Sequence, residues 1–296
     1  MRIRMTTSTF RIGDSFVHRI VELDAPSSPV LEFLPALTPE QFAESRAWLK
    51  SQRALDDEDR VLICYQSYVV RTPQHNVLVD TCLGNHKDRP HRPLWHQRSD
   101  NRFMAGLAQI GLAPGDIHYV LCTHLHTDHV GWNTRLEDGR WVPTFPNARY
   151  LFSGIELEYW LDRNAKTVVP AIADSVVPIL DAKQCDIVRS DYGLSDLLSL
   201  VPAPGHTIDH YAVTLGKHKT DAVFTGDLIH SPLQARWPEL SMRLDHDPAQ
   251  GIATRRSFLE KYCDTPTLCC FAHFPSPSVG HVKRWGDGYR CDYVNE

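Results

Sequence analysis

The stretch His124-Leu125-His126-Thr127-Asp128-His129 sets three imidazoles and one carboxylate within six residues. It follows an apolar run at residues 117–122, and we predict residues 118–122 to be a buried strand. Thr123 and the residues after it then form the loop at the carboxyl end of that strand, where open α/β sheets place their chemistry. Because borderline divalent metals prefer neutral imidazole and carboxylate ligands, the stretch predicts a metal site rather than a solvated loop.

Composition narrows the class of protein. The chain has 296 residues, of which 42% are hydrophobic and 23% charged, as in globular proteins with a sizeable core. A net charge of -5 gives no basic footprint for nucleic acid, so a small-molecule substrate fits better. No apolar run approaches the ~18 residues of a membrane span, and residues 1–8 lack the apolar core of a secretory signal. We therefore expect a cytoplasmic protein that does not enter a membrane.

The eight cysteines include no CxxC pair, and several lie in apolar runs. We expect them to be reduced and mostly buried rather than joined in disulfides.

Strand and helix patterns alternate along the chain, with no repeat or flexible linker. The predicted strands are residues 15–23, 61–71, 76–80, 118–122, 148–152, 198–202, 211–215, 222–225 and 267–271. The predicted helices are 102–110, 154–161 and 249–262, and the last of them is preceded by Asp247-Pro248 as a start signal. We predict a single domain over residues 1–296, with a lid-like insertion at about 31–54 whose helix starts at Thr38-Pro39. Strands in both halves, with helices between them, suggest two packed sheets covered by helices.

Three more polar residues follow later predicted strands. His206 comes after the strand 198–202 and a Pro204-Gly205 turn, Asp227 comes after the strand 222–225, and His273 comes after the strand 267–271. A six-residue loop cannot fill two metal coordination spheres, so these residues supply the additional ligands that the hypothesis needs.

The HxHxDH stretch, the histidine of PGHT, the aspartate of GD and the late histidine together resemble the signature of the metallo-β-lactamase superfamily, over roughly residues 65–273. The resemblance implies the αββα fold, an α/β four-layer sandwich. It also implies two divalent metal ions, one held by His124, His126 and His206 and the other by Asp128, His129 and His273, with Asp227 bridging them. Zinc suits these ligands, and manganese, iron or cobalt also fit. A hydroxide shared by two such metals is a nucleophile at neutral pH.

The resemblance gives roles to residues around the ligands. Asp80 matches an early aspartate that supports the metal loop by hydrogen bonds. His210 follows His206 by four residues and is either structural or adjacent to the metal. Trp132 stands where many relatives have glycine, and it either forms a wall of the substrate pocket or packs in the core. Lactonases of the superfamily carry a tyrosine three residues after the bridging aspartate, where this chain has His230.

The histidine at position 230 is predicted to contact the substrate and to act in catalysis with the metal-binding carboxylates Asp128 and Asp227, because imidazole can donate a proton near neutral pH. The alternative is a bystander histidine. The cationic and aromatic residues of the segment 85–96 either line the entrance of the site or form a solvated loop.

We therefore predict an enzyme, a dinuclear metal-dependent hydrolase that opens a lactone or cleaves another carboxylic ester. Phosphotriester hydrolysis is the alternative, thioester or β-lactam hydrolysis has less support, and a catalytically silent metal-binding sensor is the non-enzymatic alternative. The expected partner is a small-molecule substrate, with a homodimer left open.

Overall fold

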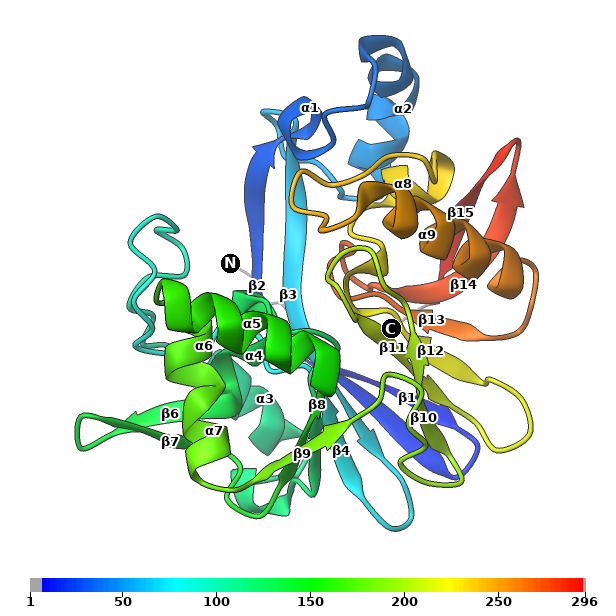
Figure 1. Ribbon diagram of the computed structural model, residues 1–296. Helices are drawn as coiled ribbons and strands as arrows, with labels where there is room; N and C mark the ends of the chain where they lie inside the picture. The colour runs from blue at the N-terminus through cyan, green and yellow to red at the C-terminus, as the bar shows by residue number, and fades with distance from the viewer. Residues whose placement is uncertain (1–6, 295–296) are drawn as a thin grey trace. The chain divides into compact units, whose positions relative to one another are not determined.

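The computed structural model describes residues 7–294 (Figure 1). The chain divides into two compact units, unit 1 with Met1–Glu22 and Tyr65–Arg189 and unit 2 with Leu23–Cys64 and Ser190–Glu296. The division falls within the long strands β2 (Ser15–Pro29) and β3 (Arg60–Arg71). Most of the N-terminal segment that was predicted to lack a secretory signal lies outside the described residues, and the prediction of a single domain stays a prediction.

Unit 1 holds a mixed sheet and a group of helices. Its strands are β1 (Thr7–Ile12), β4 (Asn76–Val79), β5 (Tyr119–Leu121), β6 (Thr134–Glu137), β7 (Arg140–Pro143), β8 (Arg149–Ser153) and β9 (Cys185–Val188). Its helices are α3 (Arg102–Gln109), η1 (Pro114–Asp116), α4 (Thr127–Val130), η2 (Gly131–Asn133), α5 (Gly154–Lys166), α6 (Pro170–Ser175) and α7 (Val177–Asp181). The sheet has the order β1-β2-β3-β4-β5-β8-β9, and β4, β5, β8 and β9 pair in parallel.

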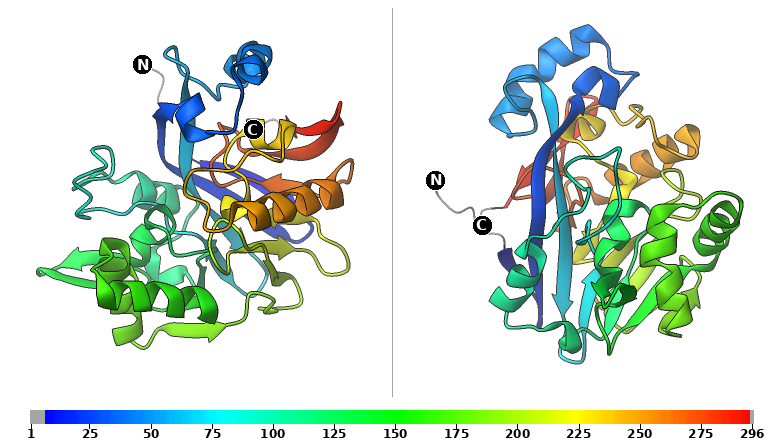
Figure 2. Two further views of the ribbon diagram at one scale, coloured as in Figure 1. Left: turned by 45° about the horizontal axis from the view of Figure 1, so that its top comes forward. Right: turned by 90° about the vertical axis from the view of Figure 1, so that its left-hand side faces the viewer.

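The parallel strands place their carboxyl ends at one edge of the sheet. Their buried runs of Val and Leu, such as residues 77–79, suit strands covered on both faces. Helices α5, α6 and α7 lie beside one another in the views of Figure 1 and Figure 2, and α5 packs next to β8. Their apolar faces join Phe103 and Leu107 of α3 in one buried core. Asp80 directly follows β4, and Thr123 comes two residues after the end of β5. Both residues are therefore held by central strands of the sheet.

Unit 2 holds a six-stranded sheet and the helices around it. Its strands are β10 (Leu198–Pro202), β11 (Tyr211–Leu215), β12 (Ala222–Phe224), β13 (Leu268–Cys270), β14 (Val279–Trp285) and β15 (Gly288–Tyr293), paired in that order. Its helices are α1 (Val30–Phe33), α2 (Pro39–Ser51), η3 (Gly226–Leu228), α8 (Pro232–Arg236) and α9 (Pro248–Tyr262). All pairs are antiparallel except β12 with β13. Helix α9 buries Phe258, Leu259 and Tyr262 in the core of this unit.

Local sequence signals set several helix ends. Thr38 accepts a hydrogen bond from the Gln41 N–H and the Gln41 side chain accepts one from the Thr38 N–H, so the predicted helix start is a complete capping box. Asp247 caps α9 through Gln250 N, as its Asp-Pro signal predicts. The segment predicted as an insertion, residues 31–54, contains α2 and all of α1 except its first residue. Its role as a lid stays a prediction.

The predicted strands coincide with observed strands to within a few residues, except that β2 continues to Pro29. The hairpin β6-β7, strands β1 and β9, the pair β14-β15 and helices α1, α4 and α6 to α8 were not predicted. A turn signal was present for the first of these, because Asp138-Gly139 joins β6 to β7 with positive φ at both residues.

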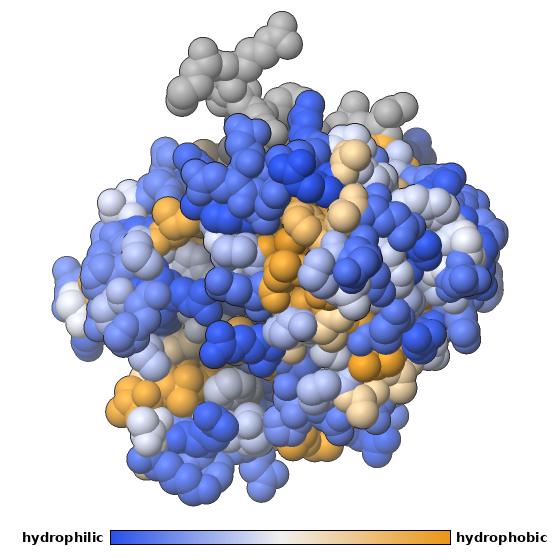
Figure 3. Space-filling model, turned by 90° about the horizontal axis from the view of Figure 1, so that it is seen from above, coloured by the Kyte–Doolittle hydropathy of each residue, from blue (hydrophilic) through white to orange (hydrophobic). Residues whose placement is uncertain are grey.

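The surface of the protein is that of a globular protein, as its composition predicts. On the face drawn in Figure 3, hydrophilic residues cover most of the surface and hydrophobic residues form separate groups. Among residues 7–294, no helix has the length and apolar character that crossing a bilayer requires. All eight cysteines are free, and five of them are buried, as predicted.

Candidate metal centre

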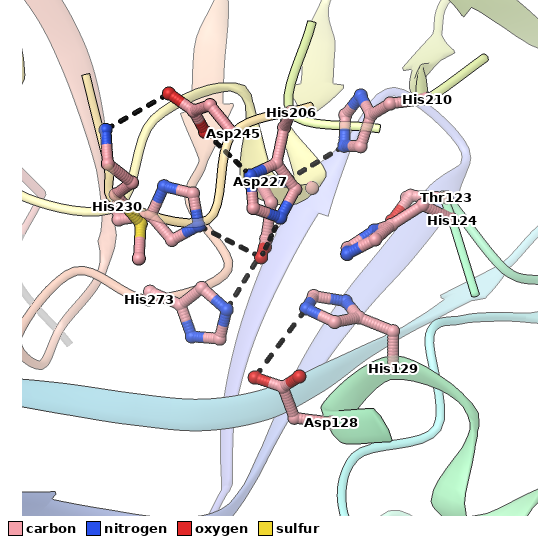
Figure 4. A network of polar contacts seen from close by, with 12 residues as sticks. Thr123, His124, Asp128, His129, His206, His210, Asp227, His230, Asp245 and His273 are labelled. Carbon is pink, nitrogen blue, oxygen red and sulfur yellow. Dashed lines mark hydrogen bonds and ion pairs between the residues drawn. The ribbon is translucent and has the colours of Figure 1, made fainter. Parts of the chain in front are cut away.

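Unit 1 gathers the ligands of the HxHxDH stretch just beyond β5. The ring centroid of His124 lies 4.6 Å from that of His126 and 4.1 Å from that of His129. The one-turn helix α4 brings Asp128 Oδ2 to 3.9 Å from His129 Nε2, and Figure 4 shows the two side chains side by side. Within this unit the structure therefore brings together all four residues that the motif predicts as ligands.

Asp80 holds this stretch from the end of β4. Its Oδ1 accepts a hydrogen bond from Thr123 N at 2.8 Å, and its Oδ2 lies 2.8 Å from His129 Nδ1. A carboxylate can only accept, so the proton of His129 is on Nδ1 and the lone pair is on Nε2. Thr123 Oγ1 lies 3.1 Å from His124 Nδ1 and also donates to Asp80. These are the contacts that the predicted supporting role of Asp80 requires.

Two glycines allow the segment after Asp80 to approach the motif. Gly131 N donates to Cys82 O at 2.8 Å, and a Cβ at Gly131 would lie 2.0 Å from the carbonyl carbon of Leu83. A Cβ at Gly84 would in turn lie 2.6 Å from the Gly131 carbonyl carbon. The backbones touch here, so neither position can carry a side chain.

Trp132 lies in the core of unit 1. Its side chain is 5% exposed, its ring stacks on Phe103 at 5.4 Å, and its Nε1 donates to Glu22 Oε1 at 2.8 Å. Glu22 Oε2 also accepts from Leu83 N, so this buried carboxyl joins the two segments that meet at Gly131. These contacts favour the core-packing alternative for Trp132, and its role toward a substrate stays a prediction.

Unit 2 gathers three imidazoles around the carboxylate of Asp227 (Figure 4). His206 Nε2 and His230 Nε2 lie 3.3 and 3.0 Å from Asp227 Oδ2, and His273 Nε2 lies 3.0 Å from Oδ1. These side chains come from the ends of β10, β12 and β13 and are 4% exposed. Ligand atoms of Asp227, His230 and His273 all fall within 4.8 Å of one another.

The other ring nitrogen of each predicted histidine ligand in this unit has an oxygen partner. His206 Nδ1 lies 2.9 Å from Asp245 Oδ1, and His273 Nδ1 lies 2.9 Å from the carbonyl oxygen of Cys64. Both oxygens can only accept, which leaves Nε2 of each ring as the nitrogen that faces Asp227. Burial alone would lower the pKa of His206, but the carboxylates of Asp227 and Asp245 outweigh it and raise that pKa to about 9.

His210 supports Asp227 from behind. Its Nδ1 donates to Ala203 O at 3.1 Å, and its Nε2 accepts from the backbone N–H of Asp227 at 2.9 Å. Both ring nitrogens of His210 are hydrogen-bonded to backbone groups. These contacts favour a structural role for His210 over a place adjacent to the metal.

His230 differs from His206 and His273 in the surroundings of its Nδ1 atom. Its backbone N–H donates to Gln234 Oε1, its Nε2 faces Asp227, and its buried Nδ1 has no hydrogen-bond partner within residues 7–294. Burial is the main cause that lowers the pKa of His230 to about 4, so the ring is neutral at pH 7.

The segment 85–96 is partly buried and partly exposed, so it is not the fully solvated loop that one prediction described. Lys87 and Arg89 are buried against Asp174 of α6. Arg89 makes two bonds to that carboxylate, at 2.8 and 3.0 Å, while Lys87 Nζ lies 3.5 Å from it and 3.6 Å from the ring centre of Trp141. Residues 91–94 are exposed.

The donor sets fit a divalent cation. A buried carboxylate ringed by imidazole Nε2 atoms attracts positive charge, and the neighbouring carboxylates raise the pKa of His206 to about 9. Imidazole and carboxylate are also the ligand types of zinc and of the neighbouring transition metals.

The chain belongs to the metallo-beta-lactamase superfamily, whose family model matches residues 65–273. Its fold is that of the superfamily, as predicted. The hydrolase AbOPH of the beta lactamase superfamily has a TM-score of 0.82 at 22% identity over 98% of both chains. The dizinc quorum-quenching lactonase AidC, solved with a product, has a TM-score of 0.77 at 21% identity and the same coverage.

A curated relative is the N-acyl homoserine lactonase of a Bacillus species. It is 25% identical over 166 residues, which are 53% of this chain and 60% of that protein. The match thus spans somewhat more than half of the relative's length.

Two buried carboxyls of the site region, Asp245 and Glu22, were not predicted. Asp245 contacts His206 from 39 residues away, and Glu22 contacts Trp132 across 110 residues. Neither stands in a motif, so only the folded chain shows these partners.

Proposed function

We propose that this chain is a dinuclear metallohydrolase that opens a lactone or cleaves another carboxylic ester. The observation that carries the proposal is the buried Asp227 carboxylate met by Nε2 of His206, His230 and His273 at 3.0–3.3 Å. The names of the similar proteins support it, since AidC is described as a dizinc lactonase and the Bacillus relative as an N-acyl homoserine lactonase.

In this proposal the ligands are those that the superfamily resemblance implies. One ion would be held by His124, His126 and His206, the other by Asp128, His129 and His273, and Asp227 would contribute to both. Two divalent ions, which we propose to be zinc, would supply a nucleophile at neutral pH and polarise the substrate carbonyl. Asp80 and His210 hold ligands in place through the hydrogen bonds described above.

The chain itself supplies a proton-transfer group in His230. Because Asp227 can only accept, the neutral ring keeps its proton on Nε2 and presents Nδ1 as an acceptor. We propose that Nδ1 accepts a hydrogen bond from the substrate or the attacking group and so assists the proton transfer.

The function is tested with purified protein by measuring metal content and turnover of an acyl homoserine lactone, an aryl ester and a phosphotriester. We expect two metal ions per chain, turnover of the lactone or ester, and loss of turnover after chelation. Preferential turnover of the phosphotriester would replace the proposed substrate class. Full metal loading without turnover of any of the three would favour a metal-binding sensor.

We expect His230→Phe to lower kcat by about 10²-fold, since general acid–base groups contribute 10²- to 10⁴-fold, while metal content stays at the wild-type value. The same substitution at the exposed His218 is the matched control and should change neither quantity. A wild-type rate in His230→Phe would show that His230 is a bystander. A loss of metal would instead make it a ligand.

A further inference from the structure

Asp245 makes a direct contact with a predicted metal ligand. Its Oδ1 accepts a hydrogen bond from His206 Nδ1 at 2.9 Å, with the two side chains 1% and 4% exposed (Figure 4). The residue lies in the loop between α8 and α9, outside every motif of the family signature.

The carboxylate of Asp245 is held in turn. Met242 N donates to its Oδ2 at 3.0 Å, and an Nη2 of Arg255 lies 3.8 Å from the same oxygen. Arg255 of α9 is 1% exposed, and its guanidinium donates to the carbonyl oxygens of Leu228, Pro238 and Leu240 at 2.7–3.0 Å. Asp245 therefore has little freedom to turn away from His206.

The same loop also fixes the backbone of His206. His246 N donates to His206 O at 3.0 Å, and Asp247 N donates to Gly205 O at 2.9 Å. Gly205 has a φ of +130°, and a Cβ there would lie 2.2 Å from Gly251 N of α9. Ring and backbone of this ligand are thus both positioned by residues 245–247 and the start of α9.

We propose that Asp245 is a positioning residue that fixes His206 with its proton on Nδ1 and its Nε2 lone pair toward the cation, and that Arg255 holds Asp245 in this task. The inference rests on the proposed metal site. The contact of a ligand histidine with a carboxylate sets the orientation of the ring and raises its basicity, and loss of such a partner weakens metal binding by 10–100-fold. Asp245 itself touches neither substrate nor reacting atoms in this proposal.

The experiment compares zinc affinity of the full chain with that of Asp245→Asn and Asp245→Ala, by competition with a chromophoric chelator. We expect binding of one zinc ion to weaken by about 10–100-fold in both variants, with the full stoichiometry restored at saturating zinc. Arg255→Lys, which loses the forked donor, should weaken the same ion by a smaller factor. Asp196→Asn is the control, because Asp196 is an exposed residue of the same unit whose carboxylate lies 3.9 Å from Lys217 Nζ, and its zinc affinity should equal that of the wild type.

A second readout separates positioning from general stability. In the zinc-loaded protein labelled with ¹⁵N histidine, the His206 signals should report Nδ1–H in the wild type and an altered or averaged state in Asp245→Ala. Zinc affinity within twofold of wild type in both Asp245 variants overturns the proposal, whatever their melting temperatures. If the wild type binds zinc but hydrolyses none of the test substrates, the proposed function fails while the affinity ratio still decides the role of Asp245.

Discussion

Asp227→Asn should reduce kcat/KM for the preferred lactone or ester by about 10³-fold or more. Asp227 is the carboxylate that three imidazoles face, and the proposal makes it the ligand shared by two cations. An amide keeps the shape but removes the charge, and metal stabilisation of the transition state accounts for several kcal/mol. Steady-state kinetics and metal analysis on the same preparation measure the effect, and the metal content should fall below that of the wild type.

The matched control is Asp221→Asn, because Asp221 lies just ahead of β12 in the same unit and its Oδ1 is 3.7 Å from Lys219 Nζ. It should retain wild-type kinetics. Unchanged turnover in Asp227→Asn would contradict the mechanism, because no other group in the proposal can take the place of the shared carboxylate.

Asp174→Asn should lower the free energy of unfolding by about 3–5 kcal/mol, the range for removing one partner of a buried ion pair. The substitution leaves the Arg89 guanidinium and the Lys87 ammonium in the interior without a carboxylate. Burial already lowers the pKa of Lys87 to about 7, despite the attraction of Asp174. Urea denaturation followed by circular dichroism measures the change.

Asp162→Asn is the control for this measurement. Asp162 pairs with Lys166 on the exposed side of α5, where ion pairs add little to stability. Its urea midpoint should match that of the wild type. Equal midpoints for Asp174→Asn and the wild type would show that the buried pair contributes nothing to holding the segment 85–96.

The sequence was sufficient for features whose signals are local. The HxHxDH stretch, the cap at Thr38 and the Asp247-Pro248 helix start each depend on residues a few positions apart, and the structure forms each of them. The later histidines and Asp227 could be found because each follows a strand whose apolar run is visible in the sequence.

The remaining features depend on contacts between distant segments. Lys87 and Arg89 look like surface cations until α6 brings Asp174 to them, from 85 or more residues along the chain. From the sequence alone, Trp132 fits a pocket wall as well as the core. Its contacts with Phe103 and Glu22 in the folded chain favour the core. Burial of a charged or aromatic side chain is decided by its tertiary partners, and a single sequence does not list them.

The contact of Gly131 with the Leu83 backbone also bears on protein engineering. A designer who wishes to shift substrate range would randomise positions near the HxHxDH stretch, but a library at position 131 should return only glycine, because any side chain overlaps the neighbouring backbone. The exposed positions 91–94 carry no such restriction. A library that varies positions 91–94, rather than the HxHxDH stretch, leaves the ligand geometry of the parent protein intact in every member.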